Sequence, residues 1–199
     1  DVDVLDFDND GMNEVWVNTW DLFSFAVWEV TGPDTYELQV EVNAGKPDAD
    51  HGMFNSHHFL TDDIDGDGRL EMLWPSTEGT LFFLDDSDDV STLTADDFVA
   101  VMNFLDPEAG SQESRGGDLG DLDDDGMTDI VISLGRGEQV IRLEHNGGDP
   151  ADSTSYDRSV VVAQTDTATV IRWYPLRIAD DLDGDGTKEI VMTNLYATD

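Results

Sequence analysis

One short acidic pattern occurs four times in this chain at nearly constant spacing. The copies share the form D-[FIL]-D-[NGD]-D-G-x-x-[DE] and are here named loop 1 (Asp6–Glu14), loop 2 (Asp63–Glu71), loop 3 (Asp121–Asp129) and loop 4 (Asp181–Glu189). Successive copies start 57, 58 and 60 residues apart, and an apolar run follows each one. A period of this length is typical of repeat architectures. We place the repeats at about residues 1–56, 57–113, 114–172 and 173–199 within a single domain, the last repeat being incomplete.

Each copy has the composition of a loop that surrounds a cation. Carboxylates at positions 1, 3 and 5 can converge on one centre, glycine at position 6 permits a sharp turn, and the acid at position 9 closes the ring. An all-oxygen set with several carboxylates on a flexible loop favours calcium over magnesium. The alternative is an Asp/Gly-rich turn without metal. Four copies that all carry the position-9 acid make that alternative the weaker one.

The loop differs from an EF-hand, which requires a glutamate at position 12. Position 12 is apolar in all four copies: Val17, Trp74, Ile132 and Met192. The runs that contain these residues are short and rich in β-branched and aromatic side chains, which predicts buried strands instead of amphipathic helices. The cation is therefore expected in a loop between two strands.

Hydrophobic alternation and turn signals predict four strands per repeat. The expected strands are Glu14–Trp20, Phe23–Val30, Tyr36–Val42, His57–Thr61, Glu71–Pro75, Thr80–Leu84, Phe98–Phe104, Arg115–Leu119, Asp129–Leu134, Glu138–Leu143, Arg158–Ala163 and Trp173–Ile178. The acidic connection Asp85–Asp97 can hold a short helical turn. Four antiparallel strands per repeat indicate an all-β fold of β-propeller blades. At about 58 residues per blade the 199 residues hold about 3.4 blades, part of a larger propeller.

The loop and its four-stranded repeat resemble the FG-GAP/VCBS-type repeats of integrin α-subunit propellers and of many secreted bacterial proteins. The chain lacks clear Phe-Gly and Gly-Ala-Pro segments, which favours the looser VCBS-like form. The resemblance implies about four calcium ions, each held by the acids at positions 1, 3, 5 and 9 and by the position-7 carbonyl. These residues are Asp6, Asp8, Asp10, Met12 and Glu14; Asp63, Asp65, Asp67, Arg69 and Glu71; Asp121, Asp123, Asp125, Met127 and Asp129; Asp181, Asp183, Asp185, Thr187 and Glu189.

The charge balance excludes several classes of function. The chain has 46 Asp and Glu against 9 Lys and Arg, a formal net charge of −37. Such a surface repels phosphate backbones and anionic lipid, and no apolar stretch is long enough to span a bilayer, so we expect neither nucleic-acid binding nor membrane insertion. The absence of cysteine excludes disulfides and thiol catalysis. With 39% hydrophobic residues the chain can form a packed core, in which we place Trp16, Trp74 and Trp173.

Few residues are candidates for catalysis. His57 and His58 precede loop 2, and Arg115 precedes loop 3 at the same offset as His57 precedes loop 2. Propeller-type polysaccharide lyases use such side chains near the axis to abstract a proton, so a lyase or hydrolase is one alternative function. The sequence fixes no complete set of nucleophile, base and orienting group around these residues. The competing interpretation is that the histidines pack beneath neighbouring aromatic side chains.

The leading hypothesis is a calcium-stabilised β-propeller module that serves binding, adhesion or assembly, with the metal structural. Its expected partners are protein or polysaccharide ligands at the cell surface, and assembly with other chains or further blades is possible. We expect a secreted or cell-surface location in a bacterium or archaeon. A structural subunit of an extracellular filament or coat is a second alternative.

Overall fold

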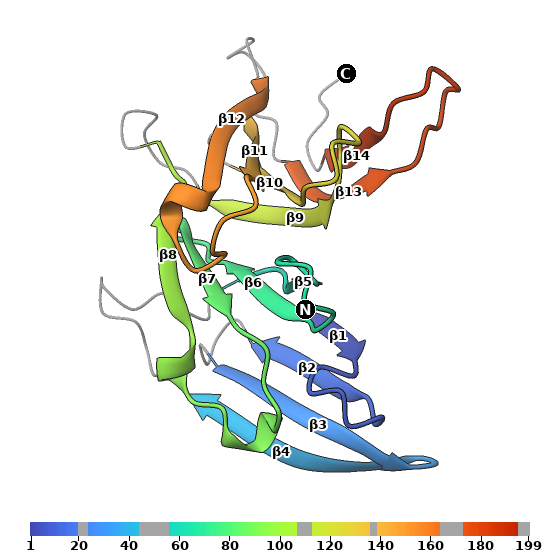
Figure 1. The fold of residues 1–199 in the computed structure, drawn as a ribbon, viewed down its shortest axis with the longest axis vertical. Helices are drawn as coiled ribbons and strands as arrows, with labels where there is room; N and C mark the ends of the chain where they lie inside the picture. Colours follow the sequence, from blue (N-terminus) through green and yellow to red (C-terminus); the bar gives the residue numbers. More distant parts are fainter. Residues whose placement is uncertain (20–23, 44–55, 107–112, 136–138, 164–172, 195–199) are drawn as a thin grey trace. The chain divides into compact units, whose positions relative to one another are not determined.

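The computed structural model describes residues 1–19, 24–43, 56–106, 113–135, 139–163 and 173–194. This part of the chain is all-β: three four-stranded antiparallel sheets, one two-stranded antiparallel sheet and three short 3-10 turns (Figure 1). No helix in these ranges is long and apolar enough to cross a membrane. The all-β prediction is confirmed. The chain divides into two compact units, Asp1–Met102 and Asn103–Asp199.

The first unit contains two four-stranded sheets, each with its strands in sequence order. The first sheet consists of β1 (Val2–Leu5), β2 (Glu14–Thr19), β3 (Ser24–Gly32) and β4 (Thr35–Asn43). The second consists of β5 (Leu60–Asp62), β6 (Glu71–Pro75), β7 (Thr80–Leu84) and β8 (Val99–Asn103), with η1 (Val90–Thr92) and η2 (Ala95–Asp97) between β7 and β8. The two 3-10 turns confirm the helical turn expected in this acidic connection.

The second unit contains one sheet of four strands and one of two. The larger sheet is formed by β9 (Ser114–Gly120), β10 (Asp129–Leu134), β11 (Gln139–His145) and β12 (Tyr156–Ala163), with η3 (Ser153–Ser155) before β12. The smaller sheet is the hairpin of β13 (Trp173–Ala179) and β14 (Glu189–Asn194). Each acidic loop joins the first and second strands of its sheet, which confirms the prediction of a loop between two strands.

A cluster of aromatic side chains forms the core of the first unit. Trp16 and Trp74 are fully buried, as predicted, and Phe25 stands between them with ring centroids 5.8 and 5.9 Å away. Phe59 meets Trp74 edge-to-face at 4.5 Å. Such contacts add about 0.5–1.5 kcal/mol each beyond the burial of apolar area. The core therefore ties the two sheets of this unit together beneath their loops. The side chain of Trp173 lies outside the described residues.

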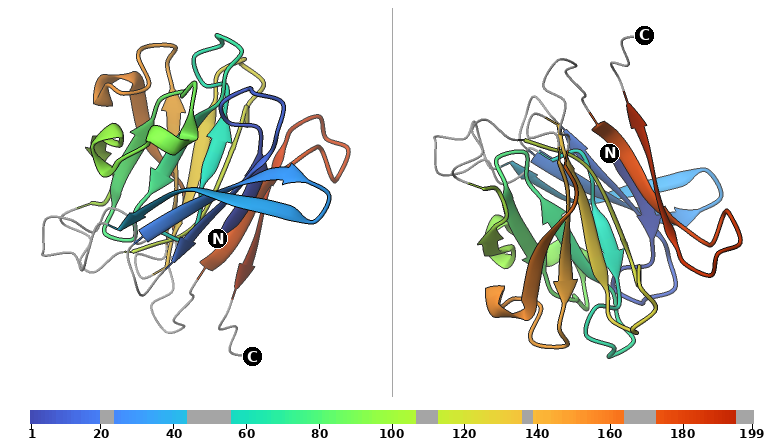
Figure 2. Two further views of the ribbon diagram at one scale, coloured as in Figure 1. Left: turned by 90° about the horizontal axis from the view of Figure 1, so that it is seen from below. Right: turned by 90° about the horizontal axis from the view of Figure 1, so that it is seen from above.

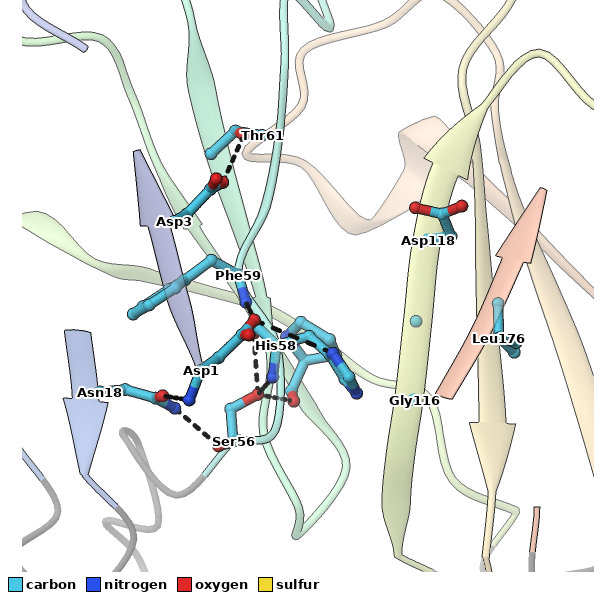
Figure 3. Close-up of polar contacts among 12 residues, drawn as sticks. Asp1, Asp3, Asn18, Ser56, His58, Phe59, Thr61, Gly116, Asp118 and Leu176 are labelled. Carbon is cyan, nitrogen blue, oxygen red and sulfur yellow. Dashed lines mark hydrogen bonds and ion pairs between the residues drawn. The ribbon is translucent and has the colours of Figure 1, made fainter. Parts of the chain in front are cut away.

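The first strands of consecutive sheets are linked within each unit. In the first unit the Asp1 carboxylate accepts the Phe59 N–H at 3.1 Å, and Asp3 accepts the Thr61 hydroxyl at 3.3 Å (Figure 3). In the second unit Asp118 on β9 accepts the Ile178 N–H of β13 at 2.7 Å. The partners are 58 and 60 residues apart, close to the repeat period. Neighbouring repeats are thus joined through equivalent strands.

The strand bounds agree with the sequence prediction best where a loop acid and a turn flank the strand. β6, β7 and β10 have the predicted bounds. The prediction of a strand from His57 is wrong, because the Ser56 hydroxyl accepts the His58 N–H at 3.2 Å and donates to the Pro75 carbonyl, which turns the chain before β5. β3 and β4 are longer than expected. They close a tight turn at Asp34, whose φ is 57°, and form the extended hairpin visible in Figure 2.

Candidate metal centres

Acidic side chains converge in every loop, but not in the same way. In loops 1, 2 and 4 the acids at positions 1, 3, 5 and 9 each bring one oxygen to within 4.8 Å of the others. In loop 3 the acids form two smaller groups, one of Asp121, Asp123 and Asp129 and one of Asp123, Asp125 and Glu144. Several clusters could therefore hold a metal ion.

One hydrogen bond of the position-9 acid is identical in all four loops. Its carboxylate accepts the backbone N–H of position 2, at 2.7 Å in loops 1, 2 and 3 and at 2.6 Å in loop 4. The position-2 side chain is apolar, and Phe7 and Ile64 are buried in the core beneath loops 1 and 2. In loops 1 and 2 burial of the position-2 side chain therefore helps to fix the N–H that holds the acid in place.

Two further hydrogen bonds shape each loop. The glycine N–H at position 6 donates to the position-1 aspartate at 2.9–3.1 Å in all four copies. The N–H at position 7 donates to the position-5 aspartate at 2.7–3.0 Å. These bonds curl the backbone around the acids. The proposed use of the position-7 carbonyls as ligands stays a prediction.

The backbone is left-handed at two positions of each loop. The position-6 glycines have φ between 87° and 93°, as the sequence reasoning requires. Position 4 is also left-handed, with φ of 58° at Asn9, 80° at Gly66, 59° at Asp124 and 83° at Gly184. Asn, Asp and Gly are the residues that tolerate this region. The restriction of position 4 to these three types was the sequence signal for this feature, and our sequence reasoning did not use it.

Loop 1 contains buried carboxylate oxygens without a hydrogen-bond donor. Glu14 is fully buried, and its Oε1, Asp6 Oδ1 and Asp8 Oδ1 accept no hydrogen bond. In loop 2 Asp63 Oδ1 is in the same condition. An unpaired buried charge is costly unless a partner or a metal compensates it. The carboxylate oxygens of loops 1 and 2 are therefore suitable ligands for a hard cation.

The electrostatics of the position-9 glutamates support the same conclusion. Burial raises the pKa of Glu14 to about 7, and the nearby charges of Asp8 and Asp6 add to this effect. Burial likewise raises the pKa of Glu71 to about 7. Glu14 and Glu71 are therefore only partly ionised near neutrality unless a cation joins them.

Loop 3 is different because a guanidinium group lies among its acids. Arg142 Nε donates to Asp129 Oδ1 at 2.5 Å, and its Nη2 donates to Asp123 Oδ2 at 2.7 Å. Glu144 lies 3.3 Å from the same Nη2. Burial raises the pKa of Asp129, while the hydrogen bond and the charge of Arg142 oppose that rise. From the sequence, Arg142 is more easily explained as a salt-bridged cation than as a functional residue, and its ion pairs confirm the salt bridge. Its place inside loop 3 was missed because Arg142 follows Asp129 by 13 residues and lies outside the motif.

The basic residues near loops 2 and 4 point elsewhere. Arg69 at position 7 of loop 2 pairs with Asp86 and Asp88, which belong to the connection after β7. Lys188 at position 8 of loop 4 pairs with Asp124 of loop 3 at 2.8 Å.

Loop 4 is the most exposed copy, and the position-2 side chain Leu182 is 66% exposed.

The three candidate catalytic residues are divided between the two units. His57 and His58 lie in the first unit, with ring centroids 6.2 Å apart, and His58 Nδ1 is 3.9 Å from the Asp1 carboxylate. Arg115 lies in the second unit, where its Nη2 pairs with Glu113 at 2.6 Å. Within the described residues of each unit, these contacts bring no nucleophile and base together.

Comparison of the chain with protein-family models and with curated proteins found no match. The resemblance to FG-GAP/VCBS-type repeats therefore rests on the loop residues and their spacing. It stays a prediction after the structure is described.

Proposed function

We propose that this chain is part of a calcium-stabilised β-propeller of the FG-GAP/VCBS type, which serves binding, adhesion or assembly outside the cell. The observation that carries the proposal is the acidic group of loop 1. Its four acids bring one oxygen each to within 4.8 Å of the others, and Glu14, Asp6 and Asp8 each have a buried oxygen without a hydrogen-bond donor. A cation would compensate the charge of these carboxylates, and the loop supplies only oxygen ligands.

Calcium suits these loops better than magnesium for a physical reason. Each complete loop offers four carboxylates, and calcium accepts six to eight oxygens in flexible geometry, whereas magnesium keeps several waters and uses few carboxylates. The metal would be structural, because it would fix the link between the first and second strands of a sheet. The residues that would hold it are the loop acids at positions 1, 3, 5 and 9.

The arrangement within each unit supports propeller blades. Consecutive antiparallel sheets are joined through their first strands, by the Asp1–Phe59 and Asp3–Thr61 bonds in the first unit and the Asp118–Ile178 bond in the second. Radial repetition of such sheets is the propeller architecture. The proposal extends this local relation to blades of one ring.

The acidic surface favours a secreted or cell-surface location, where calcium-binding modules are typically of weak affinity. Millimolar calcium outside the cell would keep such sites filled. The ligand in this proposal is a protein or a polysaccharide of low negative charge, because the excess of 37 acidic groups repels polyanions.

The proposal is tested by thermal unfolding in EDTA, in about 1 mM calcium and in equimolar magnesium. Extracellular sites with dissociation constants of roughly 10⁻⁴–10⁻³ M each contribute about 0.4–1.4 kcal/mol under these conditions. A chain of this size gains about 2–4 °C in Tm per kcal/mol. We expect calcium to raise Tm by several degrees and magnesium to raise it less.

A matched pair of variants separates site binding from general charge screening. Asp8→Asn removes a loop-1 ligand and should reduce the calcium-dependent rise in Tm. Asp157→Asn removes one exposed acid of β12, outside the four loops, and should leave that rise unchanged. An unchanged Tm in EDTA and calcium would refute the metal proposal. No observation in the described units favours a catalytic function for His57, His58 or Arg115.

A further inference from the structure

We infer that Arg142 is the resident cation of loop 3, so that this loop holds no calcium at concentrations that fill loops 1, 2 and 4. The inference rests on the proposed function, because it divides the four loops into three metal sites and one site closed by a side chain.

The guanidinium group uses the oxygens that a metal would need. Arg142 donates to Asp129 at position 9 and to Asp123 at position 3, and Glu144 lies beside it. The side chain of Asp129 is 1% exposed and that of Arg142 is 15% exposed. Three of the four oxygens of these two carboxylates already accept a hydrogen bond, two from the guanidinium and one from the Leu122 N–H. A metal that uses the oxygens bound by the guanidinium requires Arg142 to leave a nearly buried ion pair.

Loops 1 and 2 differ from loop 3 in how far their carboxylate oxygens are already satisfied by hydrogen bonds. Loops 1 and 2 retain buried oxygens without a donor, at Asp6, Asp8, Glu14 and Asp63. In loop 3 both oxygens of the position-9 acid have donors, Oδ1 from Arg142 and Oδ2 from the Leu122 N–H. Asp125, the acid at position 5 of loop 3, also lies apart from the acids at positions 1 and 9, because it groups with Glu144 instead of with Asp121 and Asp129. The four-acid cage of the other loops is thus replaced by an ion-pair network.

A second base adds to the neutralisation of loop 3. Lys188 Nζ pairs with Asp124 at position 4 and donates to the Asp121 carbonyl at position 1. The sequence has only nine Lys and Arg, and two of them contact this one loop. Loop 1 has no such partner among the described basic residues.

The sequence of the third repeat differs from that of the first two repeats at the two positions that form this ion pair. Arg142 follows the first loop aspartate by 21 residues, and the residues at the same offset after loops 1 and 2 are Val27 and Leu84, both buried. Loop 3 also has the shorter Asp129 at position 9, where the other loops have glutamate. The shorter acid and the long base occur together, as expected if the guanidinium fills the centre.

The test is a calcium titration of the 15N-labelled chain, followed by the amide signals of the four position-6 glycines. Gly11, Gly68, Gly126 and Gly186 each donate to the position-1 aspartate of their own loop, so each reports one site. We expect Gly11, Gly68 and Gly186 to shift and Gly126 to stay in place, with three calcium ions bound per chain by equilibrium dialysis. Four bound ions with a shift of Gly126 would overturn the inference and leave the proposed function intact. Absence of binding at every loop would overturn both.

The variant Arg142→Leu tests the cause. It should bind a fourth calcium ion, with at least a tenfold gain in affinity at loop 3 and a shift of Gly126. Arg177→Leu is the matched control, because Arg177 lies in the same unit, is 65% exposed and does not touch loop 3; it should still bind three ions. A count of three in folded Arg142→Leu would overturn the inference. If that variant does not fold, the wild-type count and the Gly126 signal decide by themselves.

Discussion

Replacing Glu14 by glutamine should stabilise the metal-free protein. Glu14 Oε2 accepts the Phe7 N–H at 2.7 Å, an interaction that the glutamine oxygen can preserve. The new amide group would stand where Oε1 now has no donor and could donate to Asp6 or Asp8. The substitution removes a buried charge without removing the hydrogen bond that anchors the loop.

The size of the effect follows from the pKa of Glu14. Burial raises this pKa from 4.5 to about 7, so at pH 8 ionisation of the folded protein costs about 3 kcal/mol relative to ionisation of the unfolded chain. Imperfect packing of the amide offsets part of this gain. We expect Glu14→Gln to raise the free energy of unfolding in EDTA by about 1–3 kcal/mol at pH 8.

The effect depends on pH with a defined sign. Because the folded state binds the proton more tightly, the metal-free wild type loses stability as pH rises from 4.5 to about 7. At pH 4.5 Glu14 is protonated in the folded state and half protonated in the unfolded state, so the charge-related difference between wild type and Glu14→Gln should fall to about 0.4 kcal/mol. In calcium the advantage of the variant over the wild type should shrink, because the variant loses most of the roughly 0.4–1.4 kcal/mol that calcium at about 1 mM contributes through loop 1.

Urea unfolding at pH 5 and pH 8, in EDTA and in calcium, measures these differences. The matched control is Asp129→Asn at the same position of loop 3. It breaks the ion pair with Arg142 and should lower stability in EDTA by about 1–3 kcal/mol, less than the full cost of breaking a buried pair because Arg142 keeps Asp123 and Glu144. Equal or lower stability of Glu14→Gln at pH 8 in EDTA would refute the reasoning.

Three further predictions concern the loops. Phe7→Ala should lower the free energy of unfolding by about 3–5 kcal/mol, because Phe7 is fully buried against Trp16. Leu182→Ala, at the same position of the exposed loop 4, should change it by less than about 0.5 kcal/mol, and the urea midpoints of the two variants measure the difference. Gly68→Ala should cost about 1–2 kcal/mol through its φ of 93° alone, since no atom lies within 4 Å of the added Cβ, and a loss below 0.5 kcal/mol would contradict this. The calcium affinity of loop 1 should be about tenfold weaker at pH 6 than at pH 8, because the metal displaces a proton from Glu14. The Gly11 amide signal follows this affinity, and an affinity independent of pH would exclude the displacement.

Much of the fold follows from the sequence because its signals are local. The apolar run after a loop acid and the turn at Gly79 bound β6 and β7 as predicted. The prediction fails at His57, where one side-chain hydrogen bond of Ser56 turns the backbone before the strand begins. Such a bond depends on Pro75, 19 residues away, which brings its carbonyl to the Ser56 hydroxyl. Hydrophobic patterning does not contain that information.

The sequence by itself determined the internal geometry of the loops. Glycine at position 6, a residue tolerant of left-handed backbone at position 4 and acids at positions 1, 5 and 9 produce the same hydrogen bonds in all four copies, because every partner lies within nine residues. The tertiary structure decided which acids are neutralised and by what. Arg142 reaches Asp129 from the neighbouring strand β11, and Val27 stands at the same offset after loop 1, so that Glu14 is left without a base. The charge balance of a loop is set by the strand packed beside it, and a nine-residue motif does not encode that neighbour.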